Sequence, residues 1–154
     1  MSRSIDVLRF DLDDRAYGLI TSDVVEIIRA ASPSRLPDAP PIVLGVLNVG
    51  GELVPVYDVR ARFGSRPREI APSDTMILAR AGASTVAIAV DRANDVLAVD
   101  DDALRAPPVV APQHVRGLAA LADGTLVIVE LSSFLSDHEA LSLDRALEAA
   151  AAQP

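Results

Sequence analysis

Residues 42–59 read "IVLGVLNVGGELVPVYDV", two apolar runs on either side of the pair Gly50-Gly51. Glycine reaches the positive φ angles of a tight two-residue turn without steric cost, and strand-forming residues on both sides of such a turn indicate a β-hairpin. The stretch therefore predicts one strand over 42–49, a turn at the glycines and a second strand over 52–59.

Similar patterns recur along the chain and predict a mainly β protein. Residues 5–12 alternate with a period of two, and the polar run Asp13-Asp14-Arg15 can turn the chain into a returning strand at 16–21. Two further strand–turn–strand units are expected, one over 75–81 and 84–91 around Gly82, the other over 115–131 with its turn at Asp123-Gly124.

The remaining segments connect these units. Residues 22–30 leave two options open, since Ser22 or Asp23 can cap a helix, whereas the β-branched residues that follow also allow a strand over part of the segment. The other expected features are proline-rich connectors at 32–41 and 100–113, a short helical turn and loop at 60–74, and a helix-prone segment at 141–154.

The two halves of the chain carry these features in the same order. At an offset of 69 residues, Tyr17-Gly18-Leu19 matches Val86-Ala87-Ile88, Glu26 matches Asp95 and Ile27 matches Val96. At an offset of 72, Gly45 matches Gly117, Val56-Tyr57-Asp58-Val59 matches Ile128-Val129-Glu130-Leu131, and Phe63 matches Leu135. Each match alone is weak, but their shared order predicts two copies of one mainly β unit.

About four or five strands in each copy are too few for a sandwich and enough for a small barrel, which hides its own edge strands. We therefore expect one domain over 1–154 built from two pseudo-repeated barrels with a groove between them, a common place for binding sites. The expected division is a first subdomain over 15–70, a second over 75–136, the strand 5–12 packed on either, and a C-terminal helix or tail over 137–154.

Composition excludes several classes of partner. The net charge of −8 disfavours nucleic acid and anionic lipid, because both need a basic surface. The absence of cysteine excludes disulfides, thiolate metal sites and thiol nucleophiles. No apolar run approaches the ~20 residues that span a bilayer, and the early acidic residues do not suit a signal peptide, so a cytoplasmic location is expected.

Several residues invite a catalytic or metal-binding interpretation that their surroundings disfavour. Gly50-Gly51-Glu52 spells part of a cyclic dinucleotide synthase loop, but that chemistry needs an α/β scaffold and further acidic ligands. The aspartates of 11–14 and 100–102 lack the spacing of a calcium loop. Ser133, Asp137 and His138 lack a nucleophile elbow, and neither His114 nor His138 has metal-ligand spacing around it. We expect no enzyme activity, no cofactor and no metal.

The whole pattern resembles the CheW-like domain family of bacterial chemotaxis. The resemblance covers residues 5–136, and its supporting motifs are Tyr17-Gly18-Leu19, Val24-Val25-Glu26-Ile27, Pro40-Pro41, Gly45 and Val54-Pro55-Val56-Tyr57-Asp58-Val59. It implies two five-stranded SH3-like barrels and a non-enzymatic scaffold that bridges the cytoplasmic tips of chemoreceptors to the regulatory domain of a CheA-type histidine kinase. It also implies recruitment to membrane receptor arrays through partners.

The resemblance further implies that a receptor helix lies in the groove between the barrels. The corresponding partner-binding positions are Val24, Glu26, Gly45, Asn48, Val49, Gly50 and Gly51. The hairpin departs from the family at Gly50, because the family usually reads Asn-Leu-Arg-Gly where this chain reads Asn48-Val49-Gly50-Gly51. Two alternatives stay open: a diverged CheW-like module in another kinase pathway or regulatory assembly, and, from another class, a small-molecule-binding barrel or a hydrolase.

Overall fold

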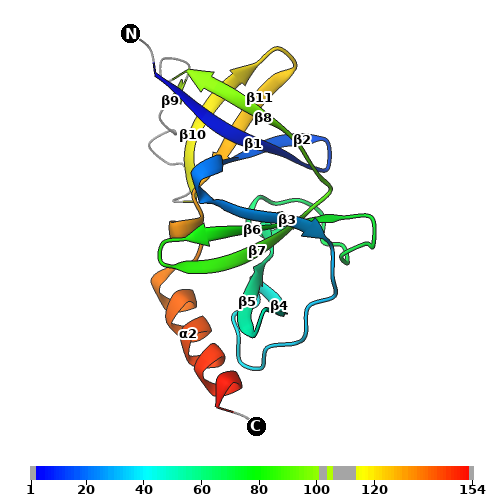
Figure 1. The fold of residues 1–154 in the computed structure, drawn as a ribbon, viewed down its shortest axis with the longest axis vertical. Coiled ribbons are helices and arrows are strands. Elements are labelled where there is room, and N and C mark those ends of the chain that lie inside the picture. Colours follow the sequence, from blue (N-terminus) through cyan, green and yellow to red (C-terminus); the bar gives the residue numbers. More distant parts are fainter. Residues whose placement is uncertain (1–2, 101–103, 106–113, 153–154) are drawn as a thin grey trace.

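The structure is a computed structural model that describes residues 3–100, 104–105 and 114–152. Strands dominate these ranges, with short 3-10 helices η1 and η3 and α-helices α1 and α2 between or after them (Figure 1). The strands are β1 (Ser4–Leu12), β2 (Arg15–Ile20), β3 (Val24–Arg29), β4 (Val43–Val49), β5 (Glu52–Tyr57), β6 (Thr75–Ala81), β7 (Ser84–Val90), β8 (Arg92–Asp100), β9 (Leu104–Arg105), β10 (Val115–Leu121) and β11 (Gly124–Val129). The helices are η1 (Thr21–Asp23), α1 (Val59–Arg62), η3 (Leu131–Ser133) and α2 (Asp137–Ala151).

The strands form two sheets, one above the other in Figure 1. The upper sheet, called barrel A, has the order β8-β1-β2-β11-β10-β9, and the lower sheet, called barrel B, has the order β3-β6-β7-β5-β4. The expected mainly β fold with short helices and a C-terminal helix is confirmed.

Each sheet closes on itself at an equivalent point. In barrel B, Ser34 follows β3 and bridges Val46 of β4 through N–O hydrogen bonds of 2.9 and 2.8 Å. In barrel A, the short strand β9 follows β8 along the chain and pairs Arg105 with Leu118 of β10. Closure leaves few free edge hydrogen-bonding groups, as the predicted barrels require.

The predicted internal repeat is confirmed by strand register. Val56 pairs with Ala87 where β5 meets β7, and the equivalent residues Ile128 and Gly18 pair where β11 meets β2. Bulges also recur, since β4 shifts register between Val43 and Gly45 and β10 shifts at the equivalent pair, Val115 and Gly117. The two copies therefore share their irregularities as well as their strands.

The copies exchange hairpins, which the sequence did not predict. The first hairpin, β1–β2, pairs with β8 and β11 in barrel A, whereas β6–β7 pairs with β3 and β5 in barrel B. The expected units 15–70 and 75–136 thus do not coincide with the two sheets, and the strand expected over 5–12 lies in barrel A. The joining contacts are two antiparallel pairings, β1 with β8 and β3 with β6, and two parallel pairings, β2 with β11 and β5 with β7. They link strands far apart in the sequence, which no local pattern encodes.

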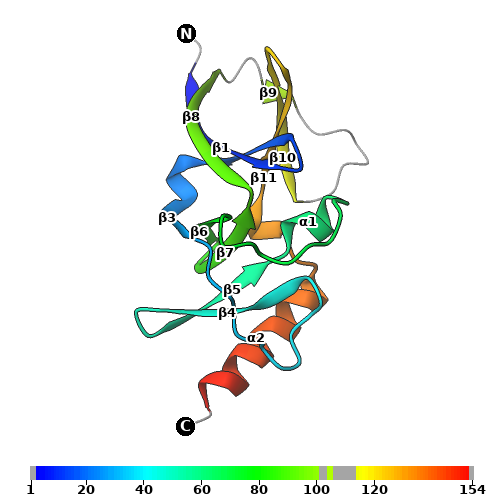
Figure 2. The same ribbon diagram turned by 90° about the vertical axis from the view of Figure 1, so that its right-hand side faces the viewer.

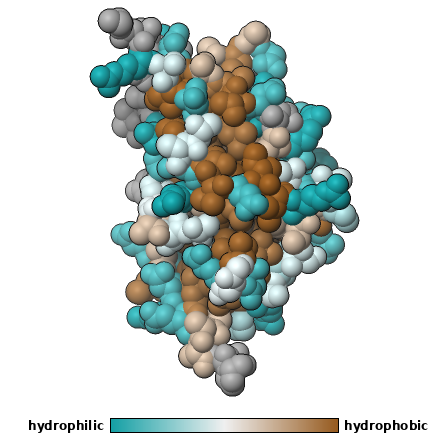
Figure 3. Space-filling view, in the orientation of Figure 1, coloured by the Kyte–Doolittle hydropathy of each residue, from teal (hydrophilic) through white to brown (hydrophobic). Residues whose placement is uncertain are grey.

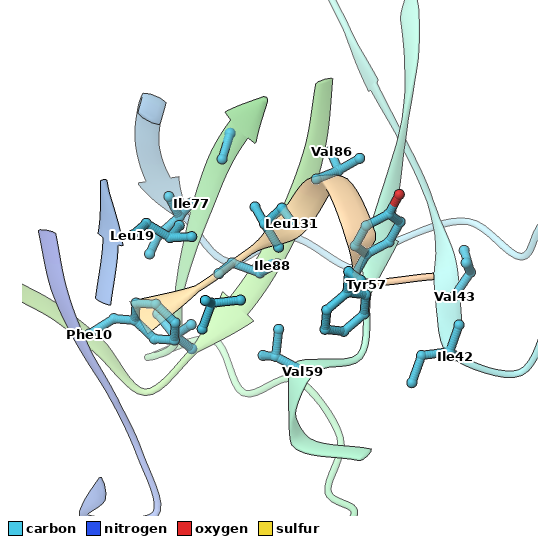
Figure 4. Packing of buried hydrophobic residues seen from close by; sticks show 14 of the residues in the cluster. Phe10, Leu19, Ile42, Val43, Tyr57, Val59, Ile77, Val86, Ile88 and Leu131 are labelled. Carbon is cyan, nitrogen blue, oxygen red and sulfur yellow. The ribbon is translucent and has the colours of Figure 1, made fainter. Parts of the chain in front are cut away.

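Three clusters of buried side chains make up the core. Small clusters fill barrel B and barrel A separately, and the largest cluster lies between the barrels (Figure 4). In β7, Ala87 and Ala89 belong to the cluster inside barrel B, whereas the alternate residues Val86, Ile88 and Val90 belong to the central cluster. The continuous apolar run of β7 is therefore explained by burial on both faces.

The C-terminal helix α2 docks on this core and ends the fold in Figure 1. Ser136 caps its first turn by accepting a hydrogen bond from the Glu139 amide, and the Glu139 carboxylate accepts one from the Ser136 amide. Leu143 and Ala146 are buried in the central cluster, so α2 is a docked helix. In the described part of the chain, no helix is long and apolar enough to cross a membrane.

Candidate functional site

The segment 22–30, left open between helix and strand, is mostly strand. A single 3-10 turn, η1, ends at Asp23, and β3 then pairs with β6 from Val24 to Arg29. Valine and isoleucine suit this extended backbone, because their branched side chains lose freedom in a helix. A bulge between Val24 and Glu26 breaks the strict alternation of the strand.

The bulge gives β3 an exposed apolar surface. Val24 packs partly against the central cluster and Glu26 is exposed, while Val25 and Ile27 expose 51% and 46% of their surface. Val96 of β8 occupies the position equivalent to Ile27 in the other barrel and is 60% exposed. Apolar side chains form a broad patch in the middle of this face, over β3 and its neighbours (Figure 3). Such patches commonly mark protein-binding surfaces.

The hairpin of β4 and β5 forms the second part of the predicted site. Gly50 and Gly51 make its two-residue turn with φ angles of 59° and 90°, as the sequence predicts. The Asn48 side chain accepts a hydrogen bond of 2.9 Å from the Gly51 amide and holds the turn in shape. Asn48, Gly50 and Gly51 are exposed and Val49 is half-buried, and the turn projects from the body of the protein (Figure 2).

Gly45 differs from the other predicted site residues because it is buried. A Cβ atom at this position would lie 2.4 Å from the carbonyl oxygen of Ser34, at a φ of +156°. The missing side chain allows β4 to approach Ser34 and close barrel B. The site positions thus fall into two groups, Val24 and Glu26 on β3 and the others on the β4–β5 hairpin. In barrel B, β3 and β4 are the two end strands of the sheet order, and the Ser34–Val46 bridge closes the gap between them.

The described residues offer little for catalysis or metal binding. They contain no group of three His, Asp or Glu side chains that could hold a metal ion. Asp13 and Asp14 form the turn between β1 and β2 with φ angles of 48° and 65°, which is a structural role. Asp137 and His138 are exposed in the first turn of α2, and Ser133 lies in η3. Asp101 and Asp102, with most of the predicted connector 100–113, lie outside the described residues.

An ionic cluster joins the two barrels and was missed by the sequence analysis. The buried Arg60 of α1 donates to Asp13 at 3.1 Å and to Asp91, and Arg68 donates to Asp91 and, at 2.8 Å, to Asp74. Burial raises the pKa of Asp91, but hydrogen bonds from the Asp13 amide and both arginines outweigh it and hold the pKa below its usual value. The hydrogen-bond partners of Asp91 lie 23 to 78 residues away along the chain, so no short sequence motif indicates the cluster.

His114, which follows the connector predicted over 100–113, is buried. Its ring stands edge-on to Phe63 and Phe134, with centroids 4.9 and 5.9 Å away. Nε2 has no hydrogen-bond partner among the described residues, and burial together with the nearby Arg62 lowers the pKa of His114. This histidine is therefore a largely buried, neutral core residue without metal-ligand geometry in the part of the chain that the structure describes.

Comparisons with known proteins match this chain over most of its length. The sequence model of the CheW-like domain matches residues 6–139. The chemotaxis protein CheW of Klebsiella aerogenes is 29% identical over 143 residues, covering 90% of this chain and 86% of that protein. The probable chemotaxis protein CheW of Rhizobium etli is 26% identical over 138 residues, with 87% and 89% covered. The crystal structure of scaffolding protein TtCheW from Thermoanaerobacter tengcongensis matches with a TM-score of 0.81 at 25% identity, covering 89% of this chain and 96% of that one.

Proposed function

This chain belongs to the CheW-like domain family, and from that premise we propose that it is a non-enzymatic adaptor of bacterial chemotaxis signal transduction. Its partners in this proposal are the cytoplasmic tip of a chemoreceptor and the regulatory domain of a CheA-type histidine kinase. It acts in the cytoplasm, beside receptor arrays to which its partners recruit it.

The observation that supports this role is the repeated exposure of aliphatic side chains on equivalent strands. Ile27 on β3 and Val96 on β8 present one apolar position on each barrel. An adaptor needs at least two surfaces, and repetition of weak contacts in an array multiplies their effective strength. The interiors of both barrels are filled by buried side chains, which disfavours the alternative of a barrel that encloses a small molecule.

The receptor surface in this proposal combines β3 with the β4–β5 hairpin. Val24 and Glu26 supply one part, and the exposed turn from Asn48 to Gly51 supplies the other. Gly45 contributes indirectly, because its close approach to Ser34 fixes the hairpin against the segment that follows β3.

A binding experiment with both partners tests the adaptor role. Purified chain is mixed separately with receptor-tip fragments and with the kinase regulatory domain, and complex formation is measured by pull-down and calorimetry. Replacing Ile27 or Val96 by serine is expected to weaken at least one interaction, because each side chain is already exposed and its loss leaves the fold intact. A folded protein that binds neither partner would contradict the proposal.

The glycine at position 50 is the feature that favours the second candidate, a diverged CheW-like module with another partner. A Cβ atom at Gly50 would meet no heavy atom within 4 Å, so the first carbon of an arginine side chain causes no clash at this exposed position. The positive φ of 59° costs such a residue about 1–2 kcal/mol. If the natural glycine at position 50 weakens receptor binding, Gly50→Arg is expected to bind the receptor fragment more tightly than a Gly50→Gln control. Equal binding by the two variants would show that Gly50 does not set the affinity for the receptor.

A further inference from the structure

A hollow of about 420 Å³ lies between α2 and the strands of barrel B. One wall is α2, and the other is formed by the start of β5 and the turn between β6 and β7. The residues that decide its chemistry are Glu52, Leu53, Ser84, Leu135, Asp144 and Leu147. We call this feature the α2 hollow.

The wall formed by α2 is a single stripe of side chains. Ala140, Leu143, Asp144 and Leu147 line the hollow, and their spacing of three and four residues places them on one face of the helix. Seven residues of helix span about 10 Å, so the hollow runs along roughly two turns of α2. Leu143 is buried and anchors the helix, while Leu147 is only partly covered. An elongated segment laid beside α2 therefore fits the shape of the hollow.

The charged side chains that line the α2 hollow are negative. Glu52 and Asp144 are exposed carboxylates in its lining, and its described lining residues include no arginine or histidine. Tyr57 lines the same space, and burial with the negative charge of Asp144 raises the pKa of its hydroxyl to about 12. The hollow thus combines the aliphatic side chains Leu53, Leu135 and Leu147 with two acidic side chains in a mixed polar and apolar lining.

We propose that the α2 hollow is a docking site for an amphipathic helix of a partner protein. The partner helix places leucine-like side chains against Leu53, Leu135 and Leu147, and places an arginine or lysine against Glu52 and Asp144. This arrangement follows the general mode in which the apolar face of a helix fills a groove and flanking charges set its direction. The hollow excludes the exposed strands β3 and β8 but adjoins the β4–β5 turn of the proposed receptor surface, because Glu52 and Leu53 line it.

Three synthetic peptides test the chemistry on the full chain. Each is a 15-residue capped helix with leucines spaced three and four residues apart, identical except that two flanking positions are arginine, glutamine or glutamate. Binding is followed by amide chemical shifts in NMR titrations. The arginine peptide is expected to shift amides at Leu53, Ser84 and Leu147, and to bind about tenfold more tightly than the glutamate peptide, because charge complementarity adds on the order of 1.4 kcal/mol.

Matched variants locate the contact. Asp144→Asn is expected to weaken the arginine peptide severalfold, whereas Glu148→Gln, an equal charge change one turn further along α2 outside the lining, leaves binding unchanged. Ser84→Trp fills the mouth of the hollow from an exposed position and is expected to abolish binding of all three peptides. Equal affinity of the arginine and glutamate peptides, perturbation confined to β3 or β8, or no binding by any peptide would overturn the proposal. Receptor and kinase binding by the same samples reports separately on the adaptor role.

Discussion

At the scale of single residues, Gly45 and Gly50 have different structural roles in the β4–β5 hairpin. Gly45 closes barrel B, because any Cβ there meets the Ser34 carbonyl, whereas Gly50 turns the hairpin in open space. Both residues have positive φ, which explains why glycine occupies a bulge at position 45 and a turn at position 50. The sequence alone does not show at which of the two positions a side chain would be more destabilising. Only the distance to Ser34 separates them.

Replacing each glycine by alanine therefore has unequal effects. We expect Gly45→Ala to lose more than about 3 kcal/mol of unfolding free energy, since φ strain and a backbone clash combine and the Ser34–Val46 bridge breaks. Gly50→Ala is expected to lose only about 1 kcal/mol from φ strain. Urea denaturation of the two variants measures this difference, and equal losses would contradict the role assigned to Gly45.

His114 is the residue that links stability to pH near neutrality. Because burial and Arg62 lower its pKa in the folded state, the unfolded chain binds a proton there more readily than the folded chain. The stabilising contribution of neutral His114 is therefore complete above the unfolded value of about 6.5 and is lost as pH falls below it. The carboxylates with lowered pKa, Asp74, Asp91 and Glu139, lose their contributions only at more acidic pH.

His114→Phe is expected to flatten the pH dependence of stability between pH 7.5 and about 5. Phenylalanine keeps the ring contacts with Phe63 and Phe134 and removes a buried nitrogen that has no partner among the described residues. Thermal unfolding across this pH range is the measurement, with the exposed His138→Phe as control. An unchanged slope in His114→Phe would show that the histidine is not the titrating group.

At the scale of elements, α2 is held by a contact with α1 in addition to its apolar face. Arg62 donates to both carboxylate oxygens of Glu139 at 2.8 and 2.9 Å and lies 5.3 Å above the ring of Phe134. Glu139 also completes the capping box with Ser136. One carboxylate thus starts the helix and orients it, and its distance of 77 residues from Arg62 explains why the sequence indicated a helix without its docking.

Glu139→Gln separates these two roles. Glutamine can still accept the Ser136 amide but loses the charge that faces Arg62, so we expect a loss of about 1–2 kcal/mol of unfolding free energy and faster amide exchange in α2. Glu148→Gln, on the exposed side of the same helix, is the control and is expected to change little. Similar behaviour of the two variants would mean that the apolar face alone holds α2.

Some strands and turns can be predicted from local sequence patterns alone, and others cannot. The hairpins around Gly50-Gly51 and Gly82 were predicted because turn chemistry and strand propensity agree within a few residues. Residues 22–30 could not be decided in the same way, because helical spacing and β-branched composition point in opposite directions. Pairing of β3 with β6, about 50 residues away, settles that segment as strand.

At the scale of the whole molecule, the exchanged hairpins make the two barrels one cooperative unit. In barrel A, the β1–β2 hairpin from the first half of the chain pairs with β8 and β11 from the second half. In barrel B, β6 and β7 from the second half join β3, β4 and β5 from the first half. The central cluster between the barrels adds a shared core. The ionic cluster around Arg60 ties the β1–β2 turn to α1 as well.

Fragments 1–70 and 71–154 are therefore expected to be largely unfolded alone and to regain structure when mixed. Each fragment contains a hairpin whose partners lie in the other fragment, and a two-stranded hairpin is marginally stable in water. Circular dichroism and NMR of the separate and mixed fragments test this, and the intact chain should unfold in one calorimetric transition. Two independent transitions, or a folded isolated fragment, would contradict the shared-core arrangement.

The sequence by itself determined the strands, the tight turns, the repeat and the mainly β class, because turn residues and the two-residue period act over short distances. The repeat further implied two equivalent barrels, and strand register confirmed it down to the bulges at Gly45 and Gly117. Only the tertiary structure decided which hairpin enters which barrel, how α2 docks, and that Arg60 and His114 are buried. These features depend on contacts between residues tens of positions apart, where the free energy of packing selects among pairings that the local pattern allows equally.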